Sequence, residues 1–189
     1  MEREREISGK EFEGKMKKDI IRINRIKAPP SKETFKIKPI RELLKKYVKD
    51  GKGWIDPFAG DNSPAEFTND LNPKKRTKHH LQAVKFCEIM KGEFQGALFD
   101  PPYSVRQIRE CYDKIGIKEF NGRCDFYSKV KEILAKKIIV GGLAISFGWN
   151  SVGFGKLRGF EVIEILLVCH SGQHNDTIVT VEKKIQENL

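Results

Sequence analysis

The stretch Leu98-Phe99-Asp100-Pro101-Pro102-Tyr103 decides how the rest of this chain is interpreted. The apolar run that ends at Phe99 is typical of a buried strand, and the two prolines prevent that strand from continuing. In an open α/β sheet, ligands bind outside the carboxyl ends of the strands. The stretch therefore predicts a carboxylate, rigid carbonyl groups and an aromatic ring at a binding site. A Pro-Pro turn capped by a core tyrosine explains the same residues equally well.

Two further strands end in acidic residues. Trp54-Ile55 enters a strand that stops at Asp56-Pro57 and is followed by the glycine-bearing loop Phe58-Ala59-Gly60. Another short run ends at Asn69-Asp70, where nucleotide-binding sheets place the acid that accepts hydrogen bonds from ribose hydroxyls. For Asp70 alone, an Asx turn before Pro73 is an equal alternative. Three acid-bearing strand ends are hard to explain as three separate turns, and together they predict one cleft.

The composition indicates one domain with a basic N-terminal arm. The chain has 189 residues, enough for one hydrophobic core, and a formal net charge of +10. Residues 1–50 hold 16 Lys and Arg against 9 Asp and Glu, so most of the excess precedes the first predicted strand. We expect residues 1–30 to form an arm that contacts a polyanion, and residues 31–189 to form the main domain. A solvated arm that only aids solubility is the simpler alternative.

The cysteines and the hydropathy pattern indicate the cellular compartment in which the protein is expected. None of the four cysteines belongs to a Cys-x-x-Cys pair or has histidines at zinc spacing. We therefore expect reduced thiols, no metal site and a cytoplasmic protein. The longest apolar run, Ile138 to Trp149, is shorter than the roughly 18 residues that span a bilayer, so no membrane association is expected.

Periodicity predicts the remaining elements. A helical pattern covers residues 38–47, 77–90, 104–112 and 126–137, and residues 20–26 suit an exposed strand or extended arm. Apolar runs predict strands over 138–147, 160–168 and 177–181, with a turn at Gly141-Gly142 leading into the first of them. The last two strands are joined by a short loop and should be antiparallel. Helices alternating with strands indicate an α/β fold.

These motifs resemble the amino-group methyltransferases that use S-adenosylmethionine, in particular small phage and bacterial adenine-specific DNA methylases. The likeness covers roughly residues 31–185. It is strongest in the stretches Thr34 to Leu44 (TFKIKPIRELL), Trp54 to Gly60 (WIDPFAG), Thr68 to Pro73 (TNDLNP), Phe99 to Tyr112, Ile145 to Ser151 (ISFGWNS) and Gly159 to Glu182.

The resemblance implies a Rossmann-like class I methyltransferase sheet, mostly parallel and closed by an antiparallel hairpin. It makes residues 31–189 the methyltransferase domain and S-adenosylmethionine the cofactor. The matching positions are Asp56, Phe58, Ala59 and Gly60 for the cofactor loop, Asp70 for the ribose hydroxyls, Lys38 and Pro39 for the methionine end of the cofactor, and Asp100, Pro101, Pro102 and Tyr103 for catalysis.

The chemistry suits these residue types. The exocyclic amine of adenine is a poor nucleophile, because its lone pair is delocalised into the ring. Hydrogen bonds from that amine to Asp100 and to the Pro101 carbonyl would favour a tetrahedral nitrogen whose lone pair points at the methyl group. Tyr103 would stack on a base that has left its duplex. We therefore expect methylation of adenine N6 in DNA by direct displacement.

The chain also departs from the family pattern. Only 10 residues separate Gly60 from Asp70, so the usual crossover helix should be short or absent and the fold reduced in its elements. Gln82 lies where the family often carries an acid that recognises the cofactor adenine. No segment is large enough for a target-recognition domain, so the arm, residues 113–125 or a partner protein would supply that role. RNA base methylation, or a catalytically silent nucleic-acid-binding module with the same fold, are the alternatives.

Overall fold

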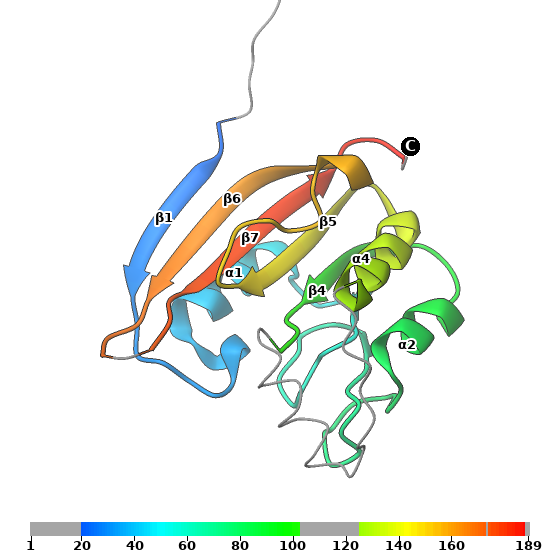
Figure 1. The fold of residues 1–189 in the computed structure, drawn as a ribbon, viewed down its shortest axis with the longest axis horizontal. Helices are drawn as coiled ribbons and strands as arrows, with labels where there is room; N and C mark the ends of the chain where they lie inside the picture. The colour runs from blue at the N-terminus through cyan, green and yellow to red at the C-terminus, as the bar shows by residue number, and fades with distance from the viewer. Residues whose placement is uncertain (1–19, 103–124, 173, 188–189) are drawn as a thin grey trace, which may run out of the picture.

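The computed structural model describes residues 20–102, 125–172 and 174–187. Within these ranges the strands form a sheet in the order β1-β6-β7-β5-β4-β2-β3 (Figure 1). The strands are β1 (Arg22–Lys27), β2 (Trp54–Asp56), β3 (Phe67–Thr68), β4 (Phe94–Phe99), β5 (Ile138–Gly148), β6 (Phe160–Cys169) and β7 (Thr177–Lys184). The helices are α1 (Lys38–Tyr47), α2 (Ala83–Ile89) and α4 (Phe126–Lys137), with short 3-10 turns η1 (Thr34–Lys36) and η2 (Lys156–Arg158).

The sheet is parallel except around β7. That strand lies between β5 and β6 and is antiparallel to both, whereas the other neighbouring pairs are parallel. The loop from Cys169 to Thr177 is too short for a parallel crossover connection, which forces this direction. The predicted mostly parallel sheet with an antiparallel closing hairpin is therefore confirmed.

The chain reverses its progress across the sheet at β2. It passes from β2 to β3 on one side and then returns to place β4 on the other side of β2. In doubly wound sheets, such a switch point leaves a crevice outside the carboxyl ends of the two strands that flank it. Asp56 ends β2 and Asp100 directly follows β4, so the topology makes both residues candidates for a binding site.

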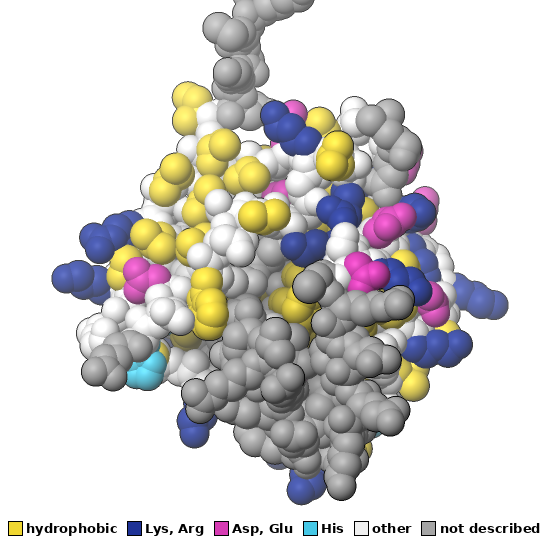
Figure 2. Space-filling model, viewed as in Figure 1, with side chains coloured by type: hydrophobic (Ala, Val, Ile, Leu, Met, Phe, Trp, Pro, Cys, Tyr) yellow, Lys and Arg dark blue, Asp and Glu magenta, His cyan; other side chains and the backbone are white. Residues whose placement is uncertain are grey.

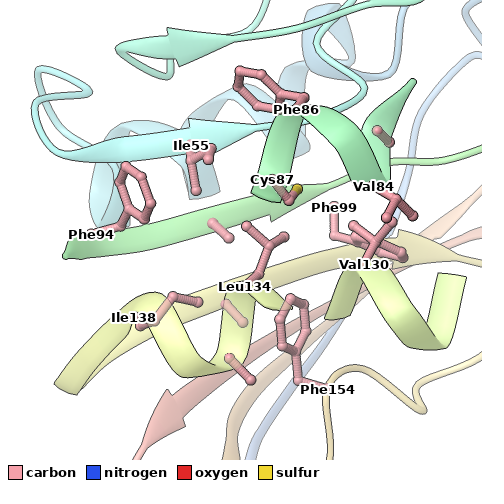
Figure 3. Packing of buried hydrophobic residues seen from close by; sticks show 14 of the residues in the cluster. Ile55, Val84, Phe86, Cys87, Phe94, Phe99, Val130, Leu134, Ile138 and Phe154 are labelled. Carbon is pink, nitrogen blue, oxygen red and sulfur yellow. The ribbon is translucent and has the colours of Figure 1, made fainter. Parts of the chain in front are cut away.

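Helices cover both faces of the sheet. Helix α1 packs on one face and helices α2 and α4 on the other (Figure 1). Val130 and Leu134 of α4 lie against the sheet together with Phe86 of α2, as Figure 3 shows. The core on the α1 face contains Ile40, Leu43, Leu44, Trp54, Leu98, Ile145, Val179 and Val181.

Strand β1 forms one edge of the sheet. It pairs in parallel with β6, from Arg22 opposite Glu164 to Lys27 opposite Cys169, and its six residues are exposed. Residues 22–27 of the expected arm therefore belong to the sheet. Figure 2 shows hydrophobic side chains gathered over β1, β6 and β7, and Ile23 in this region is 70% exposed.

Two predicted boundaries are wrong for identifiable reasons. The helix expected over 77–90 begins only at Ala83, because His79 pairs with Asn69 in a bridge and the backbone at Leu81 is held by the Asn69 side chain. The turn expected at Gly141-Gly142 is absent, because β5 runs through this pair. The register of β5 against β4 shifts there, and Gly141 adopts a φ of 87° that favours glycine.

Candidate active site

Three carboxylates meet at the carboxyl edge of the sheet. Asp56 ends β2, Asp100 directly follows β4, and Asp70 lies two residues after β3. Strands β2 and β4 are paired in parallel with Ile55 opposite Ala97, so they end at the same edge. Burial is the main cause of the raised pKa of Asp56, and the nearby negative charges of Asp100 and Asp70 raise it further. The structure thus brings together the three acids that the sequence singled out.

Asp56 is fully buried, which is unusual for a carboxyl group. Its Oδ1 accepts a hydrogen bond from the Phe58 backbone N–H at 2.9 Å, and its Oδ2 accepts one from the Ser63 hydroxyl at 2.6 Å. Burial raises the pKa of Asp56 to about 7, although these two hydrogen bonds act in the opposite direction. A proton or a cation beside this carboxylate would therefore be strongly favoured.

Asp70 is bonded to the loop that follows β2. Its Oδ2 accepts a hydrogen bond from the Gly60 N–H at 3.1 Å, and its Oδ1 accepts one from the Asn72 N–H at 2.8 Å. The loop also donates from the Ala59 N–H to the Asn69 carbonyl at 2.9 Å. Residues 57–66 contain no helix, which confirms the predicted loss of the crossover helix. The backbone carbonyl of Asn69 and the side chain of Asp70 therefore hold this loop in place.

Asn69 links three segments around the site. Its Nδ2 donates to the carbonyls of Pro57 and Leu81, and its Oδ1 accepts from the Leu81 N–H, at 2.8 to 3.0 Å. The side chain is fully buried. From the sequence, Asn69 was only a strand-end neighbour of Asp70, because all three of its side-chain bonds go to residues 12 positions away.

We expect Asn69→Ala to lower the free energy of unfolding by about 2–4 kcal/mol, because it leaves buried carbonyl and N–H groups without partners. Urea denaturation at neutral pH measures this. Asn24→Ala is the matched control, since Asn24 is exposed and its partner Glu164 keeps bonds from Lys46 and Tyr47. We expect this control to cost less than about 1 kcal/mol. Equal losses in the two variants would contradict the linking role of Asn69.

Aromatic rings connect the loop after β2 to β4. The ring centroids of Phe58 and Phe99 are 5.5 Å apart, and Tyr127 of α4 lies 5.9 Å from Phe58 and 6.1 Å from Phe99, all in edge-to-face contact. The Tyr127 hydroxyl donates to the Pro102 carbonyl at 2.8 Å. Tyr127 could not be recognised from the sequence, because no local pattern links it to a residue 25 positions earlier.

Lys38 and Pro39 lie at the first turn of α1, and Lys38 is exposed. The segment before them contacts the loop after β2, since Asn62 Nδ2 donates to Glu33 Oε1 at 2.9 Å. Gln82 is exposed and directly precedes α2, where its carbonyl accepts the Phe86 N–H. Tyr103, the helix expected over 104–112 and residues 113–124 lie outside the described residues.

The sequence matches no protein-family model and no curated protein. The structure aligns with TrmN from Thermus thermophilus at a TM-score of 0.51 and 15% identity, over 79% of this chain and 49% of TrmN. It also aligns with an rRNA methylase from Streptococcus thermophilus at a TM-score of 0.50 and 10% identity, over 77% of this chain and 93% of that protein. The chain has a Rossmann-like methyltransferase fold. At these identities the likeness concerns the fold alone.

The methyltransferase fold accounts for the place of the three acids, because its switch point lies at β2 and β4. The chain spans about half the length of TrmN. Among the described residues, no helix is both long enough and apolar enough to cross a membrane.

Proposed function

We propose that this chain transfers a methyl group from S-adenosylmethionine to the N6 amino group of adenine in DNA. The observation that supports this most directly is the position of Asp100-Pro101-Pro102 across the switch point from Asp56 and its loop. One strand end can then hold the cofactor while the other holds the acceptor group, within the same crevice. The resemblance of both motifs to adenine-specific methylases supports the same division.

The residues at the ends of β2 and β3 suit this cofactor. Each Asp70 oxygen receives one backbone N–H and keeps a lone pair that could accept a ribose hydroxyl. Gly60 has a φ of 56°, and a Cβ built there would have no heavy atom within 4 Å, so a ligand can approach this backbone. The three carboxylates favour a cationic ligand. S-adenosylmethionine, when bound, supplies an electrophilic methyl group on a positively charged sulfur.

The residues after β4 suit an amino group as acceptor. The Asp100 carboxylate and the Pro101 carbonyl can both accept a hydrogen bond from an amine, and Pro101 is buried. Proline fixes φ at positions 101 and 102, which limits the conformations of this segment before the substrate arrives. Two acceptors on one amine favour a tetrahedral nitrogen with an available lone pair. Tyr103 would stack on the adenine ring.

An amino group in RNA is the second candidate substrate. The observation that favours it is the fold shared with an rRNA methylase. Both nucleic acids would be attracted by the positive charge of the N-terminal residues. Selection of a target sequence would then fall to that basic segment or to a partner protein.

We expect the purified chain to transfer labelled methyl from S-adenosylmethionine to DNA, and nuclease digestion to yield N6-methyladenine as the product. The assay uses DNA and RNA oligonucleotides of the same sequence, each as single strand and as duplex. Greater initial rates on DNA support the first proposal, and greater rates on RNA support the second.

Calorimetry with the cofactor alone separates the remaining outcomes. Cofactor binding without label in any base would contradict both substrates, and so would label found only in cytosine of DNA. Nucleic-acid binding with neither cofactor binding nor transfer would identify the chain as a catalytically silent module.

A further inference from the structure

The segment Asp100-Pro101-Pro102 has few backbone groups that could hold it in place. Proline lacks an N–H, so neither Pro101 nor Pro102 can be fixed through an amide donor. Their carbonyl oxygens are the remaining backbone groups, and each needs a donor from elsewhere. For Pro102 that donor is the Tyr127 hydroxyl, at 2.8 Å.

The Pro102 carbonyl controls the direction in which the chain continues. The proline ring fixes φ at Pro102, and resonance keeps its following peptide group planar, so ψ is its remaining soft torsion. This torsion sets the orientation of the carbonyl and of the peptide group that follows it. A hydrogen bond to the carbonyl therefore restricts this rotation and, with it, the direction in which the chain leaves Pro102.

The Tyr127 hydroxyl is itself held by rigid surroundings. Its ring packs edge-to-face on Phe99, the last residue of β4, and on Phe58 of the cofactor loop. Helix α4 is anchored on the sheet through Val130 and Leu134, both fully buried. A Tyr ring has only two side-chain torsions, so these contacts leave its hydroxyl little freedom.

We propose that Tyr127 is a positioning residue that fixes the Pro102 carbonyl and thereby aligns the acceptor side of the site with the cofactor loop. Its hydroxyl orients the segment that follows Asp100, while its ring contacts Phe58 on the cofactor side. This inference rests on the proposed methyl transfer. It assigns the hydroxyl to catalytic alignment and the ring to cofactor binding. Removing the hydroxyl alone and removing the whole ring should therefore have different kinetic effects.

We expect Tyr127→Phe to lower kcat about tenfold, because one hydrogen bond that orients the segment is lost. The KM for S-adenosylmethionine should stay within about twofold, because the ring and its contacts remain. Tyr127→Leu removes the ring as well, so its KM for the cofactor should also rise. Initial rates at saturating nucleic acid and varied cofactor give both constants.

The matched control is Tyr47→Phe. Tyr47 also donates its hydroxyl in a partly buried place, to Glu164 Oε2 at 2.5 Å, but on the sheet face covered by α1. We expect wild-type kcat and KM from this variant. Thermal denaturation of each variant, with assays at least 10 °C below the lowest Tm, excludes unfolding as the cause.

Several results would overturn the positioning role. A wild-type kcat in Tyr127→Phe would do so, as would a kcat loss equal to that of Tyr47→Phe. A rise in the cofactor KM with unchanged kcat would also contradict it. If the wild-type chain transfers no methyl group, the proposed function fails and the inference fails with it. An active wild type with an unaffected Tyr127→Phe contradicts the inference alone.

Discussion

Replacing Asp100 with alanine is expected to lower the rate of methyl transfer by about 100-fold or more, while the cofactor still binds. In the proposed function the Asp100 carboxylate orients the amine, and loss of one preorganised polar group in an active site typically has an effect of this size. Cofactor binding should persist because the proposed ribose contact is assigned to Asp70, which follows β3 on the other side of β2. Label transfer measures the rate, and calorimetry measures cofactor affinity.

Two further variants define the effect. Asp100→Asn keeps one acceptor oxygen and should retain more activity than the alanine variant. Asp50→Ala is the control, because Asp50 is exposed after α1 and accepts a hydrogen bond only from the nearby Lys52 N–H among the bonds described for it. It should transfer methyl groups at the wild-type rate. A nearly wild-type rate for Asp100→Ala would show that this carboxylate does not orient the amine.

Replacing Asp56 with asparagine should stabilise the protein above pH 8. Burial raises the pKa of Asp56 from 3.8 to about 7, so the folded chain holds this proton more tightly than the unfolded chain does. Ionised Asp56 therefore opposes folding, and the free energy of unfolding falls as the pH rises from about 4 to 7. This difference in pKa corresponds to about 4 kcal/mol. Urea denaturation of both proteins at pH 5 and pH 8.5 tests the expectation.

The same substitution should weaken cofactor binding, because the buried negative charge favours a cationic ligand. Asp56→Asn would thus gain stability and lose function. Asp61→Asn is the control, since Asp61 pairs with Lys75 and the backbone N–H of Arg76, and these partners lower its pKa. That variant should gain no stability at pH 8.5. A pH dependence that is unchanged in Asp56→Asn would contradict the assignment to Asp56.

The parts of the site that follow from local sequence could be predicted. Prolines after Asp56 and Asp100 end their strands, and parallel strands end at one edge, so these acids had to meet. The antiparallel β7 followed from a loop too short for a crossover. In both cases the signal lies within a few residues of the feature.

The parts that depend on distant contacts could not be predicted. The start of α2 is set by Asn69, whose side chain binds Leu81, 12 residues away. Tyr127 was unremarkable in the sequence, because its partner Pro102 precedes it by 25 residues. The path of β5 through Gly141-Gly142 depends on its register against β4. A local sequence pattern does not indicate which distant residues will be in contact.

The position of β1 also affects how the protein is made. Residues 22–27 are synthesised early, but their partner strand contains residues 164–169, and Asn24 bonds to Glu164 across 140 positions. A ribosome must therefore add most of the chain before β1 finds its partner. Until then the backbone N–H and C=O groups on that edge of β6 also lack their strand partner. Among the described strands, β1 is synthesised first and is thus among the last to dock, and it stays unpaired while the residues between it and β6 are added.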